Sequence, residues 1–418
     1  MTILGIADAT VASLIRPLTD PAHDRAAVAE RFARATWTGV AEPGDRVAGA
    51  VIAALGAEAA LGRLLDDRSG VQLRHALAEQ EAEQALELEE GELEQAVARW
   101  TPRLTKSAAL LALRQAARFA ASLVVPGDAE WPRRMDDLGD HAPIALWVRG
   151  DRGRLRSLEA SIAIVGARAA TGYGEHVTVE LAAGLCDRGY AIVSGAAYGI
   201  DGASHRAALA SNAPTIAFLA GGLDRFYPSG HEALLGRIIE RGAAVSEVPC
   251  GAAPTKWRFL QRNRLIAASS LATVVVEAGA RSGSLNTAGH AAALGRPLGA
   301  VPGPVTSSTS VGCHRLLREY DAVCVTSAAE IAELAPLPDA DAAPPTVEEA
   351  EPGAARPAAD PAGTRIRLLD ALAPRSPRSP EKLAALSGLA VDRVRAELGL
   401  LALEGAVRES GDGWVRAS

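Results

Sequence analysis

A short segment that combines cations with aromatic residues stands out in the middle of the sequence. Between Glu247 and Glu277 there is no other acidic residue. The cations in this interval are Lys256, Arg258, Arg262 and Arg264. Trp257 and Phe259 alternate with them in the segment KWRFLQRNR, which also contains Asn263. Cationic groups neutralise phosphates, and aromatic rings offer faces on which unpaired bases stack. The segment predicts a basic patch that binds single-stranded nucleic acid; the alternative is a basic amphipathic helix that packs its aromatic side chains into the core.

The loop of residues 166–174, GARAATGYG, has the composition of a phosphate-binding loop. It follows an apolar segment and precedes a helical one. Gly166 allows a close approach of the backbone, the following helix offers free N–H groups, and Arg168 adds a bidentate phosphate donor. We therefore expect Gly166 and Arg168 to contact phosphate. The alternative is a loop whose composition serves only its turn geometry.

Three further loops are also rich in small residues. Residues 194–201 (SGAAYGID) include Gly195, and residues 221–228 (GGLDRFYP) include Gly222. Residues 277–287 (EAGARSGSLNT) include Ser282, Gly283 and Ser284. Taken singly, each loop is compatible with plain turn chemistry. Taken together at one edge of a sheet, they predict a site for a polyanion or for a nucleotide with several anchoring points.

Several other kinds of chemistry do not fit the sequence. The spacing of Gly166, Gly172 and Gly174 departs from GxGxxG, and there is no GxxxxGK[ST] segment, which argues against NAD and against ATP bound through a P-loop. The eight histidines form no HxH or HExxH pattern, the four cysteines form no CxxC pair, and no motif links a histidine to a nucleophile. We expect no cofactor, no metal and no enzymatic activity.

The elements that must position these loops form a parallel sheet. Short apolar segments alternate with helical ones, which is typical of βαβ units. The strand candidates are residues 161–165, 191–194, 215–220, 244–247, 272–277 and 298–301. Nearly continuous apolar strands indicate a sheet covered on both faces. We expect an α/β fold, a doubly wound and Rossmann-like parallel sheet, with ligands at the carboxyl ends of its strands.

The sequence around this sheet divides into three further parts. Residues 1–122 show helical spacing and predict an all-α domain, SAM-like or helix-hairpin-helix-like, before a sheet domain of residues 123–335. Residues 336–363 contain seven prolines and six acids and predict a linker. Residues 364–418 predict three helices and a Gly-Asp-Gly hairpin, a winged-helix-like domain.

The overall charge excludes a uniformly basic surface. The net charge is −7, and much of the acidic excess lies in the predicted linker and in residues 79–94, which contain eight glutamates and no cation. We interpret residues 79–94 as a helix with a solvated acidic face; the alternative is an acidic docking surface. No stretch of about 18 apolar residues and no basic leader occurs, so we expect a cytoplasmic protein without a membrane span.

The motifs, taken in order, resemble those of the DNA-processing protein A (DprA, or Smf) family. They are IVGAR at 164–168, SGAAYGID at 194–201, GGLDRFYP at 221–228, RNRLIAASS at 262–270, VVVEAGARSGSLNTA at 274–288 and AVPGP at 300–304. The resemblance covers residues 125–335. It implies an extended Rossmann fold without an established reaction, which binds single-stranded DNA, protects incoming DNA and helps to load the RecA recombinase in natural transformation.

The resemblance also implies individual DNA contacts and partners. The arginine of the GAR motif corresponds to Arg168, and the lysine and aromatic residue before the RNR motif correspond to Lys256 and Phe259. The family implies a homodimer and a RecA-binding surface on the Rossmann domain, without assigning residues to either. The sequence departs from the family at residues 229–231 (SGH) and 319–321 (EYD).

Two alternatives remain open at this point. The same superfamily includes nucleotide-hydrolysing phosphoribohydrolases of the LOG type, but their PGGxGTxxE motif is not reproduced around Gly222 or Glu277. The other alternative makes the C-terminal domain the main DNA reader through Arg393 and Arg395, although Glu397 and Glu404 weaken its positive face.

Overall fold

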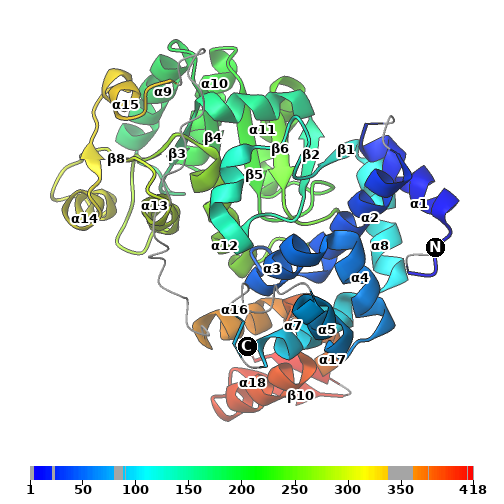
Figure 1. Ribbon diagram of the computed structural model, residues 1–418. Coiled ribbons are helices and arrows are strands. Elements are labelled where there is room, and N and C mark those ends of the chain that lie inside the picture. The colour runs from blue at the N-terminus through cyan, green and yellow to red at the C-terminus, as the bar shows by residue number, and fades with distance from the viewer. Residues whose placement is uncertain are drawn as a thin grey trace.

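The computed structural model describes residues 4–20, 24–79, 88–89, 91–337, 361–374, 376–411 and 413–417 (Figure 1). These residues form three parts. A large sheet is covered by helices, a group of N-terminal helices lies beside it, and a C-terminal unit lies below both in the view of Figure 1.

The described strands form a nine-stranded sheet of order β1-β2-β6-β5-β4-β3-β7-β8-β9. From β3 to β9 all pairings are parallel, whereas β2 pairs antiparallel with both β1 and β6. The strands are β1 (Ala121–Val124), β2 (Leu146–Gly150), β3 (Ser161–Val165), β4 (Ala191–Ser194), β5 (Thr215–Leu219), β6 (Ala243–Ser246), β7 (Ala272–Val275), β8 (Leu298–Ala300) and β9 (Val323–Cys324). The chain winds outward from β3 to β6 and then resumes on the other side of β3, so the topological switch point lies between β3 and β7.

The α/β fold class predicted from the sequence is confirmed, and the strands β3 to β8 begin and end within two residues of their predicted bounds. The sheet is mostly rather than wholly parallel, because β2 pairs antiparallel with β1 and β6. The strands β1, β2 and β9 are not among those predicted from the sequence. β9 has only two residues, Val323 and Cys324, and both are exposed. The turns between β1 and β2 include the 3-10 segment η3 (Arg133–His141) in place of an α-helix, so the two strands lack the βαβ spacing.

Helices cover both faces of the sheet. α12 (Lys256–Ser269), α13 (Ser284–Ala293) and α14 (Val311–Glu319) share a buried apolar cluster with one face of the strands. The helices of the other face are α9 (Gly172–Cys186), α10 (Ile200–Ala210), α11 (Glu232–Arg241) and α15 (Ala328–Leu334). This double covering explains why the central strands are apolar along their whole length.

The N-terminal region is helical, as predicted. Its helices are α1 (Asp8–Ile15), α2 (Arg25–Val40), α3 (Arg46–Leu55), α4 (Ala57–Asp66), α5 (Val71–Glu79), α7 (Glu92–Trp100) and α8 (Lys106–Arg118). Trp37 and Trp100 meet edge to face in one core, at 5.1 Å between ring centroids. Phe32 and Leu113 instead share a core with Trp147 of β2, so part of the helical region packs directly on the sheet. Most of the acidic segment of residues 79–94 lies outside the described residues.

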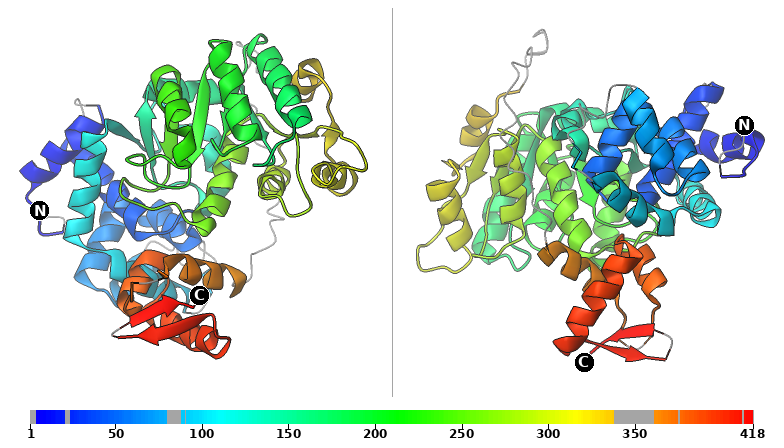
Figure 2. Two further views of the ribbon diagram at one scale, coloured as in Figure 1. Left: turned by 180° about the vertical axis from the view of Figure 1, so that it is seen from behind. Right: turned by 60° about the horizontal axis from the view of Figure 1, so that its bottom comes forward.

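The C-terminal unit consists of three helices and a hairpin, as predicted. Its elements are α16 (Pro361–Ala371), α17 (Pro380–Ser387), α18 (Val391–Leu403), β10 (Val407–Ser410) and β11 (Gly413–Arg416). It has an apolar core of its own, and it projects from the rest of the molecule in the right-hand view of Figure 2. Of the predicted linker, residues 338–360 lie outside the described residues.

Among the described residues, no single helix is both long and apolar enough to cross a membrane. The pair α3 and α4 meets those criteria only when taken together, and the two helices are bent by 107° at their junction.

Candidate nucleic-acid interface

The predicted loops meet at one edge of the sheet because the strands before them run parallel. The N–H of Ala167 donates to the carbonyl of Glu277 at 2.7 Å, which joins the loop after β3 to the loop after β7. The N–H of Ile200 donates to the carbonyl of Ala167 at 3.2 Å, which adds the loop after β4. The N–H of Gly222 donates to Ala252 at 2.8 Å, so the loop after β5 contacts the segment that leads to α12.

Three of the glycines predicted as phosphate contacts have a packing role at this edge. A Cβ on Gly166 would lie 2.5 Å from Ile200, and a Cβ on Gly195 would lie 2.4 Å from the guanidinium of Arg262. A Cβ on Gly222 would lie 2.6 Å from the carbonyl of Pro249. Distances of this kind exclude any side chain, so these glycines are required for the loops to close on one another.

The loop before α13 is more open. Nothing lies within 4 Å of a Cβ built on Gly283, which is exposed, as is its neighbour Arg281. The hydroxyls of Ser282 and Ser284 are 2.7 Å apart, and Ser284 is buried. Of the three residues predicted here, Gly283 therefore has the most accessible backbone.

Phe259 is the centre of an exposed cluster of cations and rings. The guanidinium carbon of Arg168 lies 5.2 Å from the centroid of the Phe259 ring, and the ring of Tyr227 lies 5.5 Å from it. Arg168 is exposed, Phe259 is half-buried and Tyr227 is 50% exposed. Lys256 is exposed one turn earlier on α12, and within the described part of the chain neither it nor Arg168 has an ion-pair partner. We call Arg168, Tyr227, Lys256 and Phe259 the Phe259 cluster.

The contribution of Tyr227 to this cluster is missing from the residues predicted as DNA contacts. Its loop, GGLDRFYP, does carry a signal, because two aromatic residues directly follow the exposed cation Arg225. The loop on its own does not reveal that Tyr227 contacts α12, about thirty residues later. Only the fold brings the ring to Phe259.

Arg262 lies inside the protein. It donates to the carbonyls of Gly195, at 2.9 Å, and of Phe218. Burial lowers the pKa of Arg262 to about 10, which Asp201 partly opposes. Burial likewise raises the pKa of Asp201, whose carboxylate accepts the N–H of Gly195 at 3.2 Å and is stabilised by Arg262. Arg262 and Asp201 thus connect α12 to the loop after β4 inside the protein.

Arg264 and Asn263 are also buried. Arg264 donates to both carboxylate oxygens of Glu247, at 2.7 and 2.6 Å, and to the carbonyl of His141 at 3.0 Å. The amide of Asn263 donates to the side chain of Asn286 at 3.1 Å. The prediction that the RNR motif belongs to an exposed basic patch is therefore wrong for Arg262 and Arg264, because acidic partners from distant loops neutralise them in the interior.

The remaining residues of the basic segment are covered by other parts of the molecule. Arg258 donates to Glu42 of the N-terminal region at 3.1 and 2.8 Å. The guanidinium carbon of Arg367, on α16, lies 5.5 Å from the centroid of Trp257. Arg367 therefore covers part of the half-buried ring of Trp257.

The comparisons with known proteins agree with this arrangement. Residues 122–336 match the model of the DNA recombination-mediator protein A family, and residues 352–413 match that of the DprA winged helix domain. The chain belongs to the DNA recombination-mediator protein A (DprA) family. The family resemblance predicted from the motifs is confirmed, and the C-terminal unit of this DprA-family chain is a winged helix domain.

Individual relatives are similar over long stretches. The chain is 46% identical over 307 residues to the DNA processing protein DprA of Mycobacterium tuberculosis, which covers 71% of this chain and 77% of the relative. It is 37% identical over 201 residues to the DNA processing protein DprA of Streptococcus pneumoniae, which covers 48% of this chain and 70% of the relative. The X-ray structure of DNA processing protein A from Streptococcus pneumoniae superposes with a TM-score of 0.54 at 26% identity, covering 72% of this chain and 95% of that one.

The alternative of a phosphoribohydrolase is not favoured in this DprA-family chain. The carboxylate of Glu277 is 2% exposed and accepts from the N–H and hydroxyl of Thr171, at 2.9 and 2.6 Å, and from the hydroxyl of Thr309 at 3.2 Å. This carboxylate holds the loop after β3 to the segments after β7 and β8. Among the residues with described positions, no group of three His, Cys, Asp or Glu side chains could hold a metal ion.

The winged helix offers a weaker positive surface than the Phe259 cluster. Arg393 is exposed on α18, but Arg395 donates to Glu381 of α17 at 2.9 Å. Asp392, in the first turn of the same helix, is 3.6 Å from Arg395. This pairing argues against the winged helix as the main DNA reader.

Residues 229–231, where we expect the sequence to differ from the family, have a structural role here. His231 is buried, and its Nδ1 lies 3.0 Å from the carbonyl oxygen of Ala196. Its ring meets the exposed ring of Tyr198 at 4.7 Å between centroids. The residue therefore ties the loop after β5 to the loop after β4.

Proposed function

We propose that this protein binds single-stranded DNA, protects incoming DNA and helps to load the RecA recombinase during natural transformation or recombination. The observation that carries this proposal is the Phe259 cluster at the carboxyl edge of the sheet. It places Arg168 and Lys256, which have no ion-pair partner among the described residues, beside the half-buried ring of Phe259 and the exposed ring of Tyr227. Cations and aromatic rings are the combination that an unpaired strand needs. Membership of the DprA family supports the same role.

The proposed DNA contacts are residues of the four loops and of α12. Lys256 and Arg168 neutralise phosphates, while Phe259 and Tyr227 offer ring faces to bases. Gly283 is the open position of the fourth loop. Gly166, Gly195 and Gly222 bring the loops together, and Arg262, Asn263 and Arg264 position α12 from inside the protein.

The preference for single strands can be measured by fluorescence anisotropy with a labelled thymidine 20-mer and a labelled 20-base-pair duplex. We expect the single strand to bind more tightly at every salt concentration. Equal or tighter binding of the duplex would contradict the proposal, because stacking on Phe259 requires unpaired bases.

We further propose that the chain is not an enzyme and acts in the cytoplasm without a cofactor. The engaged carboxylate of Glu277 supports the first statement, and the four free cysteines are consistent with a reducing compartment. Incubation with nucleoside monophosphates should release no free base. Release of base would instead support the LOG-type alternative.

A homodimer is the remaining part of the proposal, and the outer edge of the sheet supports it. β9 is an edge strand, and Val305, Val311 and Val323 around it are 87%, 43% and 47% exposed. Exposed apolar side chains near the open edge of a sheet are typical of an interface. Light scattering should give twice the chain mass, and Val323→Lys should shift the protein to the monomer.

RecA loading and the domain boundaries are proposals as well. Addition of the protein should increase RecA-dependent ATP hydrolysis on DNA covered by a single-strand-binding protein. We propose boundaries near residues 122 and 335, which the bounds of the first family match, 122 and 336, support. The second match begins at 352 and α16 begins at Pro361, so we propose that the winged helix domain begins before residue 363.

A further inference from the structure

The winged helix contacts the DNA-binding segment directly. The side chain of Asp370, on α16, accepts the backbone N–H of Lys256 at 2.6 Å. Lys256 is the first residue of α12, where backbone N–H groups are free and a negative charge is stabilised. A carboxylate of the winged helix thus occupies the end of α12 that carries a cation of the Phe259 cluster.

Next to this contact, one buried cluster connects all three parts of the molecule. Glu42, from the N-terminal region, pairs with Arg258 of α12 at 2.8 Å and with Arg103 at 2.5 Å. Burial alone would raise the pKa of Glu42, but Arg258 and Arg103 outweigh it and hold this pKa well below its usual value. Arg367 of α16 adds a third positive charge near the same carboxylate. We call Glu42, Arg103, Arg258 and Arg367 the Glu42 cluster.

Two arginines of the Glu42 cluster hold the end of α17. Arg103 donates to the carbonyls of Ala385, at 2.8 Å, and Leu386, at 3.3 Å. Arg367 donates to Ser387 at 2.9 Å and to Gly388. A Cβ on Gly388 would lie 2.7 Å from the guanidinium of Arg103, from that of Arg367 and from Glu42. The close fit at Gly388 is therefore a requirement for docking of the winged helix.

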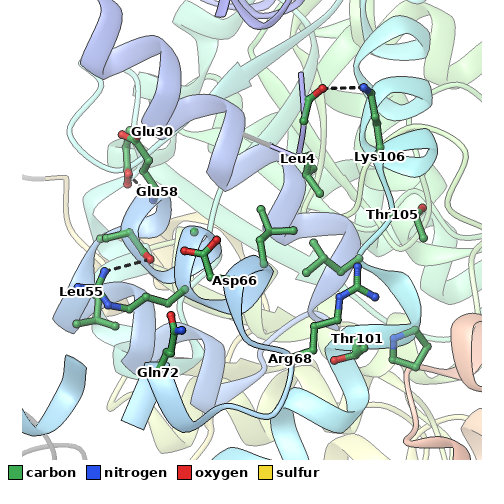
Figure 3. Close-up of a pocket in the computed structure, with 18 of the residues that line it drawn as sticks. Leu4, Glu30, Leu55, Glu58, Asp66, Arg68, Gln72, Thr101, Thr105 and Lys106 are labelled. Carbon is green, nitrogen blue, oxygen red and sulfur yellow. Dashed lines mark hydrogen bonds between the residues drawn. The ribbon is translucent and has the colours of Figure 1, made fainter. Parts of the chain in front are cut away.

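The docked winged helix also borders a cavity of about 1760 Å³. The N-terminal helices line most of this cavity, and the winged helix contributes Glu381 and Val391. Its lining is rich in charged side chains (Figure 3), among them Glu58, Asp66 and Lys106. The buried apolar cluster of the winged helix consists of its own residues. Release of this domain would therefore break mainly polar contacts and would uncover the ring of Trp257.

We propose that the docked winged helix is autoinhibitory: it competes in cis with single-stranded DNA for the first turn of α12. This inference rests on the proposed DNA-binding function. A phosphate at Lys256 and the carboxylate of Asp370 would occupy the same place and repel each other. DNA binding and docking are then negatively coupled, and release of the winged helix also uncovers Trp257 for stacking.

The test uses two glycines of the winged helix in the full-length protein. Gly388→Asn keeps the left-handed backbone that its φ of +67° requires, since asparagine tolerates it, but its side chain does not fit against the Glu42 cluster. Gly405→Asn is the matched control, because Gly405 has a φ of +72° and nothing within 4 Å of its Cβ. Neither substitution changes the charge of the protein.

We expect Gly388→Asn to bind a labelled thymidine 20-mer about tenfold more tightly than wild type, which corresponds to an open fraction of about one tenth in wild type. Gly405→Asn should bind like wild type. Small-angle X-ray scattering should show a larger radius of gyration for Gly388→Asn alone, and for wild type once the 20-mer is added.

A second variant disrupts the docking contact from the N-terminal region and leaves the sequence of the winged helix unchanged. Arg103→Gln removes a cation, so an effect of charge alone would weaken DNA binding, whereas release of the winged helix would strengthen it. We expect tighter binding and an expanded particle. The thermal transition of both variants shows whether the remaining domains are folded.

Unchanged or weaker DNA binding in Gly388→Asn and Arg103→Gln would overturn the autoinhibition, whether or not the particle expands. Weaker binding would mean that the docked winged helix is part of the DNA surface. If wild type and both variants bind no single-stranded DNA, the proposed function itself fails.

Discussion

The two halves of α12 carry the same kinds of residue and have opposite environments. In the first turns, Lys256 is exposed and Phe259 lies in an accessible cluster with Arg168. In the later turns, Arg262 and Arg264 are 6% and 2% exposed and bonded to acceptors inside the protein. A cation-rich segment is therefore a binding surface only where its charges lack internal partners.

The internal partners come from outside the acid-free segment of residues 248–276. Glu42 neutralises Arg258 from the N-terminal region, Asp201 stabilises Arg262, and Glu247 pairs with Arg264. The absence of acidic residues between 248 and 276 is real in the sequence, but the fold supplies acids from elsewhere. The exposed positive charge is therefore smaller than the sequence indicates, and it is concentrated at one end of the helix.

The largest expected effect lies in the buried half of α12. Arg264→Met would leave the carboxylate of Glu247 buried without its partner, and breaking a buried ion pair from one side costs about 3–5 kcal/mol of unfolding free energy. Chemical denaturation would measure it. Arg281→Met, at an exposed arginine, is the control and should change stability by less than about 0.5 kcal/mol. Similar stabilities for the two variants would show that the buried ion pair of Arg264 and Glu247 contributes no more than an exposed arginine.

In the exposed half, we expect the largest effect on DNA binding at Phe259. Phe259→Leu keeps an apolar side chain but removes the ring, and stacking of one base contributes about 1–3 kcal/mol. Affinity for a thymidine 20-mer should therefore fall between about fivefold and a hundredfold. Phe259→Tyr should retain most of the affinity. Equal losses in the two variants would indicate a packing role in place of stacking.

The buried side chain of His205, on α10, should make the stability of the protein depend on pH. This side chain is fully buried; its Nδ1 lies 2.7 Å from the hydroxyl of Thr215, and burial lowers its pKa to about 3 from the usual 6.5. Between these values the unfolded state binds more protons, so stability rises with pH and is lost as pH falls from about 6.5. The loss attributable to His205 is about 2 kcal/mol between pH 6.5 and 5.

His205→Gln removes the titrating group, so its stability should change less over this pH range than that of wild type. Denaturation midpoints at pH 6.5 and 5 would measure both slopes. A variant slope equal to that of wild type would show that His205 is not the group responsible.

Most of the fold could be predicted from the sequence because it depends on local patterns. Apolar runs followed by glycine-rich turns mark β3 to β8, and Ser379-Pro380-Glu381 marks the start of α17, where the side chain of Ser379 accepts the N–H of Lys382 at 3.3 Å. Three strands lie outside these patterns. β9 has only two residues, and β1 and β2 pair antiparallel outside the βαβ repeat.

The site could be predicted from the sequence only in part. Arg168 and Phe259 each carry a local signal, and the fold brings them together. The burial of Arg264 depends on Glu247, and the covering of Trp257 depends on Arg367, more than a hundred residues later. Such long-range pairs leave no trace in the spacing of neighbouring residues, so sequence patterns overestimate the exposed charge of α12.

The most direct test of the central claim is the salt dependence of DNA binding in Arg168→Ala, Lys256→Ala and their double variant. Each lost phosphate contact on a single strand should reduce the slope of log K against log salt by about 0.7, and the double variant by about 1.4. Arg188→Ala, at an exposed arginine that precedes β4 at the opposite edge of the sheet, is the control and should keep the wild-type slope. Unchanged slopes in the three site variants would contradict the assignment of the Phe259 cluster as the DNA-binding surface.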